Sequence, residues 1–310
     1  MVHPVLKSWK FWLGFLLLSG LVWLVGEEYG WVSLLSAWQR VPPEALAVAV
    51  ALMLVSYLLR AVRFFDFFML RSQRHFVRLL RITVLHNFFN NMMPMRSGEA
   101  SFPMLMKDYF AVPYRHSGPA LLWLRLLDLY ALLALAFISL QSLVPWPLAV
   151  KVVISALVII APLSALLVQE KVRRWLLSHQ DGSWQSKASE LMTALPDSPM
   201  RFVRALFWTL VNWLVKIVVY AWLLQVFTGL DFYQCWSGAT TGELSSVLPI
   251  HGIAGAGTYE AGVVAGLLPW QVDASTALAA AVNLHLFVLG TTLLLTGLLV
   301  LLTHGVRNRS

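Results

Sequence analysis

The stretch Asn90-Asn91-Met92-Met93-Pro94-Met95-Arg96-Ser97-Gly98-Glu99 places amides, a proline, an arginine and a carboxylate between two apolar arms. The arms, residues 79 to 93 and 100 to 113, are each shorter than the roughly 20 helical residues that cross a hydrocarbon core. Both are apolar enough to enter it, so we predict a re-entrant hairpin with its polar turn at membrane depth. Irregular backbone at that depth persists only where it is buried in protein or lines a wet cavity. The remainder of the chain should therefore be the scaffold around this stretch, which we call the first break.

The composition is that of an integral membrane protein. The 310 residues are 59% hydrophobic and 12% charged, and 14 of them are tryptophan. The longest polar stretch, residues 170 to 200, is too short to form a soluble enzyme module. We therefore expect one transmembrane domain over residues 1 to 310, with any chemistry or transport inside the bilayer or at its surface.

The formal net charge of +8 would suit a nucleic-acid partner, but the basic residues follow a membrane topology instead. With a cytoplasmic N-terminus, the basic residues of the loops and termini lie on the cytoplasmic side, and only Arg40 and Lys151 lie outside. This is a strong positive-inside bias. It predicts a multi-pass protein of a bacterial-type cytoplasmic membrane, with both termini in the cytoplasm and no nucleic-acid partner.

Six segments are long and apolar enough for full membrane spans. They lie at about 11 to 26, 44 to 62, 117 to 140, 147 to 168, 205 to 228 and 274 to 302. The predicted fold is an all-α integral membrane protein with about six full spans and two re-entrant helical hairpins. Residues 170 to 200 mix charges with glycine and proline, which indicates a cytoplasmic connector. It would separate a first half, residues 1 to 169, from a second half, residues 201 to 310.

The second half repeats the plan of the first. Pro249-Ile250-His251-Gly252-Ile253-Ala254-Gly255-Ala256-Gly257 is a glycine-rich second break between two short apolar arms, in a hairpin of about residues 232 to 270. The predicted crossings bring the first hairpin, at about residues 79 to 113, in from the cytoplasm and the second from the outside. Transporters built as inverted repeats bind their ligand where broken helices meet near the midplane. We therefore expect the two breaks to face each other.

The first break offers a site for an anion. Gly98 permits a turn, and Ser97 is the expected N-cap of the second arm, whose free N–H groups would suit a phosphate beside Arg96. Charged residues inside a membrane are functional candidates by default. Asn91, Arg96 and Glu99 are therefore candidate substrate ligands. An Arg96 to Glu99 ion pair that only neutralises a structural loop is the alternative.

The second hairpin carries two carboxylates and a histidine as candidates. Glu243 lies in its first arm, His251 in the break and Glu260 early in its second arm. Each carboxylate is expected either to be neutral and carry a proton or to pair with a distant cation. The small-xxx-small patterns from Gly238 to Gly242 and from Gly262 to Gly266 predict close helix packing rather than function, with the two arms pressed against neighbouring spans.

Three charged residues lie inside the predicted spans. Arg125 and Asp128 are three residues apart, so they share a helical face and can neutralise each other or contact substrate. Lys216 has no neighbouring carboxylate in sequence, so it needs an anionic ligand or a partner such as Glu99, Glu260 or Asp128. Asn283 and His285 are weaker signals, because a lone polar residue in a span usually bonds a neighbouring helix.

The motifs together resemble a known family. Pro94-Met-Arg96-Ser-Gly98-Glu99, then Arg125-Leu-Leu-Asp128, then Pro249 followed by Gly252, Gly255, Gly257 and Glu260 are similar to the flippase-like transmembrane domain of lysylphosphatidylglycerol synthetases. The most specific of these is the family's Pro-x-Arg-x-Gly-Glu signature. The chain departs from the family in having Phe102-Pro103 where members often continue with arginine. It also has no soluble aminoacyl-transferase domain, so we expect a stand-alone relative without lipid aminoacylation.

The resemblance implies a protein that moves an anionic lipid between leaflets, such as a phospholipid, a polyprenyl phosphate or a hopanoid-type lipid. We expect no enzyme activity, cofactor or metal, because the sequence has neither a Walker A nor an HExxH pattern. A membrane-embedded enzyme that acts on a lipid phosphate through His251 or Glu260 is the competing hypothesis. A third is a non-transporting accessory subunit. Proton coupling, coupling to the membrane potential, uncoupled exchange and assembly into an oligomer all remain open.

Overall fold

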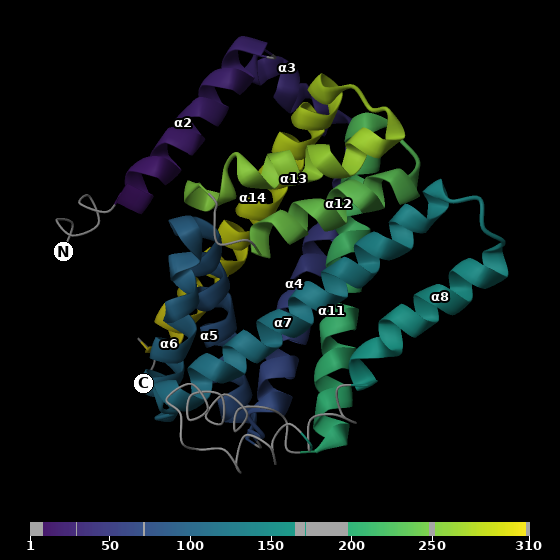
Figure 1. Ribbon diagram of the computed structural model, residues 1–310. Coiled ribbons are helices and arrows are strands. Elements are labelled where there is room, and N and C mark those ends of the chain that lie inside the picture. Colours follow the sequence, from purple (N-terminus) through teal and green to yellow (C-terminus); the bar gives the residue numbers. More distant parts are fainter. Residues whose placement is uncertain are drawn as a thin grey trace. The chain divides into compact units, whose positions relative to one another are not determined.

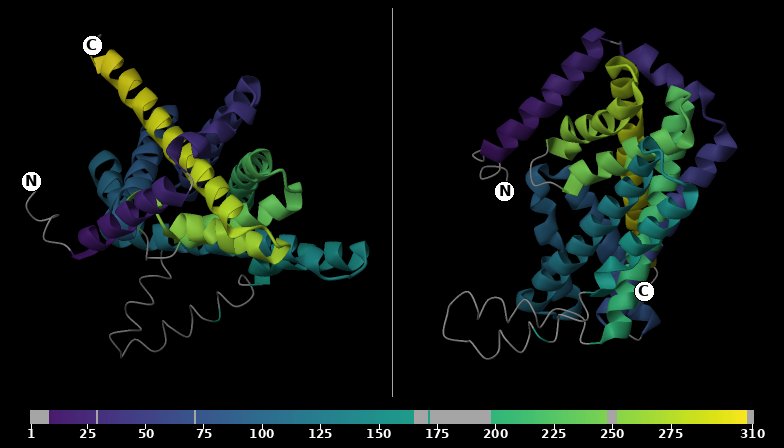
Figure 2. Two further views of the ribbon diagram at one scale, coloured as in Figure 1. Left: turned by 90° about the horizontal axis from the view of Figure 1, so that it is seen from above. Right: turned by 45° about the vertical axis from the view of Figure 1, so that its right-hand side comes forward.

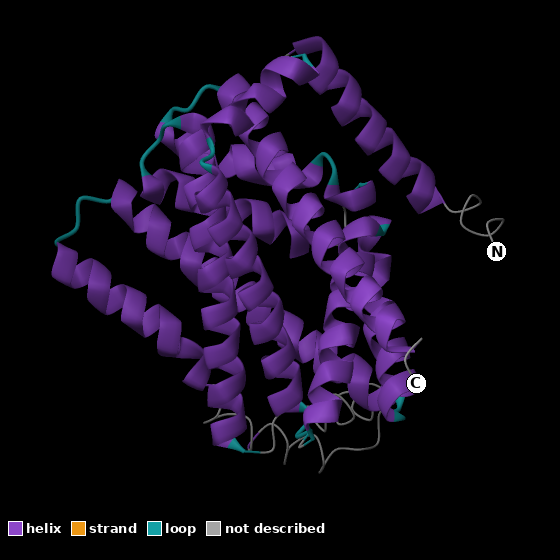
Figure 3. Cartoon of the chain, turned by 180° about the vertical axis from the view of Figure 1, so that it is seen from behind, coloured by secondary structure: helices purple, strands orange, loops and turns teal. Residues whose placement is uncertain are grey.

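The computed structural model describes residues 9–28, 30–70, 72–164, 171, 198–247 and 252–307. Within these residues all regular structure is helical, as Figure 3 shows. The all-α prediction is thereby confirmed for the described part of the chain. Most of the predicted connector, residues 170 to 200, lies outside the described residues, and so does the first part of the second break, residues 249 to 251.

Four helices of the described residues are long and apolar enough to cross a membrane. They are α4 (Pro43–Phe67), α7 (Tyr114–Leu140, continued by the 3-10 helix η3, Gln141–Leu143), α11 (Pro199–Thr228) and α14 (Ala274–Arg307). Both views of Figure 2 show α14 as one unbroken helix. These helices contain four of the six predicted spans, which are confirmed as membrane-span candidates.

The other two predicted spans have a different form. Residues 11 to 26 lie in α2 (Trp9–Glu28), which qualifies as a span only together with α3 (Trp31–Ser36) and η1 (Ala37–Arg40). The two pieces meet at an 85° bend. Gly30 lies at this bend with a φ of 69°, a backbone conformation that glycine adopts at no steric cost. Of the predicted span 147 to 168, residues 148 to 164 form the shorter helix α8 (Leu148–Ile160) with η4 (Ala161–Ser164), and residues 165 to 168 lie outside the described residues. The described residues therefore hold four or five span candidates.

Each predicted hairpin is a pair of helices around a break. The first consists of α5 (Gln73–Met92), the 3-10 helix η2 (Pro94–Ala100) and α6 (Ser101–Phe110). The first arm therefore begins earlier than residue 79, because hydropathy marks where a helix enters an apolar environment and not where its hydrogen bonds start. The expectation that Ser97 caps the second arm is wrong. Ser97 lies inside η2, and its hydroxyl donates to the Pro94 carbonyl oxygen over 2.8 Å.

The second pair consists of α12 (Phe232–Val247) and α13 (Thr258–Leu267), with η5 (Ile253–Gly255) before α13 and η6 (Leu268–Trp270) after it. The two helices contact each other and lie side by side in Figure 1. Glycines make this approach possible: a methyl group added at Gly242 would come within 2.6 Å of Val263 Cγ2. One added at Gly262 would come within 2.8 Å of the Thr241 carbonyl oxygen. The small-xxx-small prediction of close packing is confirmed, but these glycines bring the two arms against each other rather than against a neighbouring span.

The chain divides into two compact units. The first unit comprises Met1–Leu58, Thr83–Ser101 and Leu214–Ser310, and the second comprises Leu59–Ile82 and Phe102–Trp213. These compact units differ from the two halves predicted from the sequence. The halves describe an internal repeat along the chain, and that repeat remains a prediction.

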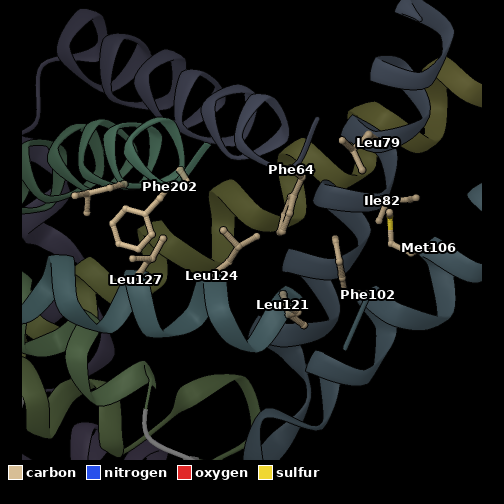
Figure 4. Close-up of a cluster of buried hydrophobic side chains, with 11 residues drawn as sticks. Phe64, Leu79, Ile82, Phe102, Met106, Leu121, Leu124, Leu127 and Phe202 are labelled. Carbon is tan, nitrogen blue, oxygen red and sulfur yellow. The ribbon is translucent and has the colours of Figure 1, made fainter. Parts of the chain in front are cut away.

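The second unit is held together by an apolar core. Phe64, Leu79, Phe102, Leu124 and Phe202 come from α4, α5, α6, α7 and α11 and pack in one buried cluster, drawn in Figure 4. The rings of Phe64 and Phe102 stack with centroids 4.5 Å apart. In the first unit, α13 packs against both α12 and α14, and α2 contacts η2 and η5.

Candidate functional site

The two breaks are neighbours within the first unit. The 3-10 helices η2 and η5 contact each other. Arg96 of the first break donates a hydrogen bond from Nη1 to the Ser246 carbonyl oxygen over 3.1 Å. Ser246 lies in the last turn of α12, where helix carbonyls lack intrahelical donors and form the negative end of the helix dipole. The prediction that the breaks lie together is confirmed, and a cation of one break is bound to the helix that leads into the other.

Both breaks hold a non-glycine residue in a left-handed backbone conformation. Arg96 has a φ of 51° and Ala254 a φ of 56°. This conformation costs roughly 1 to 2 kcal/mol for a residue with a side chain. Such residues persist where the surrounding structure fixes them, and they cluster at functional sites. In the first break the backbone at Gly98 packs directly against the backbone of Phe89, and a methyl group at Gly98 would overlap it. This close contact holds the break, including Arg96, in its conformation.

Arg96 also pairs with Glu99, as the neutralising alternative predicted. The side chains of Arg96 and Glu99 are 12% and 24% exposed, so the pair is only partly covered. On its other side, Glu99 Oε2 lies 3.6 Å from Nε2 of His86, whose Nδ1 is 3.0 Å from Ser101 Oγ. His86 was missed from the sequence. The available signal was its position on α5 one turn before the amides of the first break.

Asn91 bonds to a helix distant in sequence. Its Nδ2 donates to Thr292 Oγ1 on α14 over 2.9 Å, and the Tyr57 hydroxyl lies 3.3 Å from the same oxygen. The neighbouring Asn90 has a buried Oδ1 that lacks a hydrogen-bond partner among the described residues. Asn91 therefore links α5 to α14, and its role as a substrate ligand remains a prediction.

Lys216 pairs with Glu243, which is none of the three carboxylates predicted as its partner. Its Nζ lies 3.1 Å from Glu243 Oε2, and both side chains are largely buried. The pair joins α11 to α12. Of the two alternatives predicted for Glu243, pairing with a distant cation is therefore the one found. This particular pair could not be predicted from sequence spacing, because 27 residues separate Lys216 from Glu243 in the chain.

Glu260 is held on two sides. Its Oε2 accepts a hydrogen bond from the Gly257 backbone N–H over 2.8 Å, which caps the start of α13. Its Oε1 lies 2.6 Å from Nδ1 of His285 on α14, with the two side chains 2% and 8% exposed. The ring of Tyr259 packs on the His285 ring with centroids 4.6 Å apart. His285, a weak signal in the sequence, is therefore the partner of a predicted site residue. The other histidine candidate, His251, lies outside the described residues.

The second unit contains a charge cluster of its own, centred on Asp128 and completed by Arg63, Arg125, Thr209 and Trp213. Arg63 donates to both carboxylate oxygens of Asp128, over 2.6 and 3.3 Å. Arg125 donates over 3.1 Å, so the predicted pairing of Arg125 with Asp128 is confirmed. The indole N–H of Trp213 donates to Asp128 over 2.9 Å. The side chains of Arg63 and Asp128 are each 1% exposed.

Arg63 is the main residue of this cluster that the sequence analysis missed. It follows the second predicted span and was counted with the cytoplasmic cations. Its Nη1 also donates to Thr209 Oγ1 over 2.9 Å, so α4, α7 and α11 meet at this side chain. No group of three or more metal-ligating side chains that could hold an ion is present within the described residues.

The fold and these side chains define a multi-pass helical membrane protein in which charged residues are paired at helix breaks and inside spans. The family model for the lysylphosphatidylglycerol synthase transmembrane region matches residues 11–296, and the chain therefore belongs to this family. The resemblance that the motifs indicated is confirmed. Neither a curated protein nor a solved structure matches the chain.

Proposed function

We propose that this protein is a flippase or transporter that moves an anionic lipid between the leaflets of a bacterial-type inner membrane, and that it is not an enzyme. Membership of the lysylphosphatidylglycerol synthase transmembrane family supports a role in lipid modification or movement. The observation that carries the proposal is the hydrogen bond of Arg96 to the Ser246 carbonyl oxygen. It brings a cation and two irregular backbone segments to one place in the first unit.

The two helix pairs are, in this proposal, re-entrant hairpins that enter from opposite sides as an inverted repeat. Three of the four arms support this topology by their length, whereas α5 has 20 residues. Helices α6 and α13 have 10 residues each and α12 has 16, all fewer than the roughly 20 that cross a hydrocarbon core. Their breaks would then meet inside the membrane, where broken helices form the ligand sites of many transporters. Both termini would lie in the cytoplasm, as the distribution of basic residues predicts.

In the first unit, Arg96 and Lys216 would attract the phosphate of the lipid. Each has a carboxylate partner at rest, Glu99 and Glu243, so a phosphate would enter by exchanging places with a carboxylate. Such an exchange keeps the cation paired throughout, which matters because an unpaired buried charge costs several kcal/mol. The displaced Glu99 carboxylate is 24% exposed, so water can solvate it. Arg125 of the second unit, whose side chain is 15% exposed, is a separate candidate for an anion contact.

The direct test is leaflet exchange in vesicles of phosphatidylcholine and phosphatidylglycerol that contain the purified protein. Labelled phosphatidylglycerol, labelled polyprenyl phosphate and labelled phosphatidylcholine are compared, and transfer between leaflets is followed by quenching the label from outside. The anionic lipids should exchange faster than phosphatidylcholine. Arg96→Gln should slow the exchange by about tenfold to a hundredfold, because a hydrogen bond to a charged group contributes roughly 1.5 to 3 kcal/mol.

Arg40→Gln is the matched control, since Arg40 is an exposed arginine of the same unit and lies outside both breaks. It should exchange lipid like the unmodified protein. Unchanged exchange in folded Arg96→Gln and Glu99→Gln variants would refute the site. The enzyme alternative is tested in the same vesicles by mass spectrometry, because an enzyme changes the mass of the lipid and a flippase changes only its leaflet.

A further inference from the structure

Glu260 and His285 form a buried contact whose net charge depends on one proton. The two side chains meet over 2.6 Å and are almost fully covered. An ionised carboxylate beside a neutral imidazole carries a charge of −1, and the same pair with one more proton is neutral overall. Addition of one proton to the pair would therefore change the buried charge next to the second break.

The surrounding elements do not supply another cation bonded to Glu260 within the described residues. On α12, Glu243 is paired with Lys216 of α11. On η2, which contacts η5, Arg96 is paired with Glu99. By sequence, the remaining charged or titratable residues of the elements packed around the second break are Tyr259 of α13, Tyr233 and Cys235 of α12, His304 and Arg307 of α14, and Lys10, Glu27 and Glu28 of α2. Among the described contacts of Glu260, His285 is the side chain that can carry a positive charge.

The pair also touches the backbone of the second break. The Gly257 N–H donates to Glu260, so the carboxylate fixes the start of α13. The His285 ring lies directly against the break, because a methyl group at Gly255 would be 3.4 Å from its Nε2. A change at either side chain therefore acts on η5, which contacts the η2 segment that carries Arg96.

A further buried hydroxyl, that of Tyr259, belongs to a residue beside this pair. The Tyr259 ring lies tilted by 33° against the His285 ring, and its Cζ lies 3.4 Å from the position that a methyl group at Gly242 would take. Gly242 immediately precedes Glu243. Within the described residues the Tyr259 hydroxyl is buried and has no hydrogen-bond partner. It is therefore available to a water molecule or a proton donor beside the pair.

We propose that Glu260 and His285 form the proton-binding site that couples lipid movement to a proton gradient. A hydronium ion gives its proton to Nε2 of His285 and leaves as water, while Nδ1 keeps its hydrogen bond to Glu260. The pair thereby changes from −1 to neutral. Loss of this proton to water on the other side restores the negative charge beside the second break, and this charge draws Arg96 away from Glu99. The proposal rests on the proposed function and assigns its energy source.

The experiment uses the same vesicles with labelled phosphatidylglycerol, a pH difference of about one unit and the membrane potential clamped by potassium and valinomycin. One proton that moves together with one anionic lipid makes an electroneutral step, which allows a final leaflet ratio of up to about tenfold, because one pH unit corresponds to a tenfold change in an equilibrium constant. The unmodified protein should shift the ratio away from its value without a gradient. A pH dye inside the vesicles should record proton movement when a lipid gradient is imposed.

His285→Asn retains a hydrogen-bond donor near Nδ1 but cannot bind the proton. It should exchange lipid more slowly and lose the effect of the pH difference on the final leaflet ratio, which does not depend on the rate of exchange. His116→Asn is the matched control, because His116 is exposed on α7 in the second unit, and it should behave like the unmodified protein. If the unmodified protein exchanges lipid rapidly but its leaflet ratio does not respond to the pH gradient, the coupling is refuted and the proposed function is not. An undiminished response of the leaflet ratio in His285→Asn would likewise refute the assignment of the proton-binding site. Absence of protein-dependent exchange for every lipid would overturn both.

Discussion

Charged residues in this protein differ in how many hydrogen-bond partners they have and in how exposed they are. Asp128 receives hydrogen bonds from Arg63, Arg125 and Trp213 and is fully covered. Arg96 and Glu99 are partly exposed, and Arg96 divides its bonds between a carboxylate and a backbone carbonyl. A saturated buried carboxylate mainly stabilises the fold, whereas a partly exposed ion pair can exchange its partners. We therefore expect mutations at these two places to affect different properties.

Replacement of Asp128 by alanine should destabilise the protein strongly. Arg63 is 1% exposed, and the substitution would leave its guanidinium buried without the carboxylate. Breaking a buried pair by removing one partner costs about 3 to 5 kcal/mol. Thermal unfolding in detergent should accordingly show a large decrease in the midpoint for Asp128→Ala.

Asp66→Ala is the control for this prediction. Asp66 pairs with Arg204 over 2.5 Å in the same unit, but the Arg204 side chain is 48% exposed. Exposed ion pairs contribute about 0 to 1 kcal/mol, so this variant should unfold close to the unmodified protein. Equal decreases in the two variants would contradict the assignment of Asp128 as a buried structural centre.

At the scale of single residues, the sequence indicated which charged side chains lie inside the protein better than it indicated their partners. Arg96, Glu243 and Glu260 were identified because charges inside apolar segments are costly. Their partners Ser246, Lys216 and His285 could not be assigned from spacing, because these contacts join different helices. The Arg125–Asp128 and Arg96–Glu99 pairs were the exceptions, since the members of each pair lie three residues apart in the chain.

Among the elements, the α12 and α13 pair depends most directly on residue size. Its helices approach through glycines, and there is no room for a methyl group at several of them. Inside a membrane, such packing contributes to helix association because lipid tails compete equally well for apolar side chains. The same helix pair holds Glu243 and Glu260, so its spacing also sets the positions of two candidate site residues.

Gly262→Ala should separate these two helices. The added methyl group would lie 2.6 Å from Ser245 Oγ and 2.8 Å from the Thr241 carbonyl oxygen, so α13 has to move. Overpacking of this kind costs typically about 1 to 3 kcal/mol. We expect a lower unfolding midpoint together with slower lipid exchange, since Glu260 moves with α13.

Gly290→Ala provides the comparison. Gly290 lies in α14, and a methyl group there meets nothing within 4 Å in the protein. Alanine is more favourable than glycine in a helix by about 1 kcal/mol, so stability should stay equal or increase. A Gly262→Ala variant as stable and active as Gly290→Ala would show that α12 and α13 need not be closely packed.

The elements themselves were predictable where hydropathy and helix length agree. The segments inside α4, α7, α11 and α14 were found for this reason. The start of α5 was not, because Gln73 to Arg81 is polar yet helical, and hydropathy records the environment of a segment rather than its hydrogen bonding. The Ser97 cap failed for a related reason, since the chain continues as a 3-10 helix through Ala100 before α6 begins.

At the scale of the whole molecule, the order of segments along the chain was enough to suggest that the two breaks meet. The contact of η2 with η5 agrees with this, although more than 150 residues separate the two in sequence. The order of segments does not indicate whether the two breaks move apart. If the proposed transport proceeds by alternating access, the contact between the breaks has to open and close as lipid passes.

A reversible cross-link between the breaks should therefore stop lipid exchange. Ser97→Cys and Ala254→Cys place one thiol in η2 and one in η5, and a flexible bifunctional thiosulfonate can join them. The native Cys235 is buried and should not react. In the joined protein we expect exchange at least about tenfold slower, which corresponds to a barrier higher by about 1.4 kcal/mol, and recovery after addition of a reductant.

Each single-cysteine variant treated in the same way should retain its activity, because the reagent then has only one end attached. Full activity of the joined protein would mean that the two breaks move as one body during transport, and lipid would then have to pass without their separation.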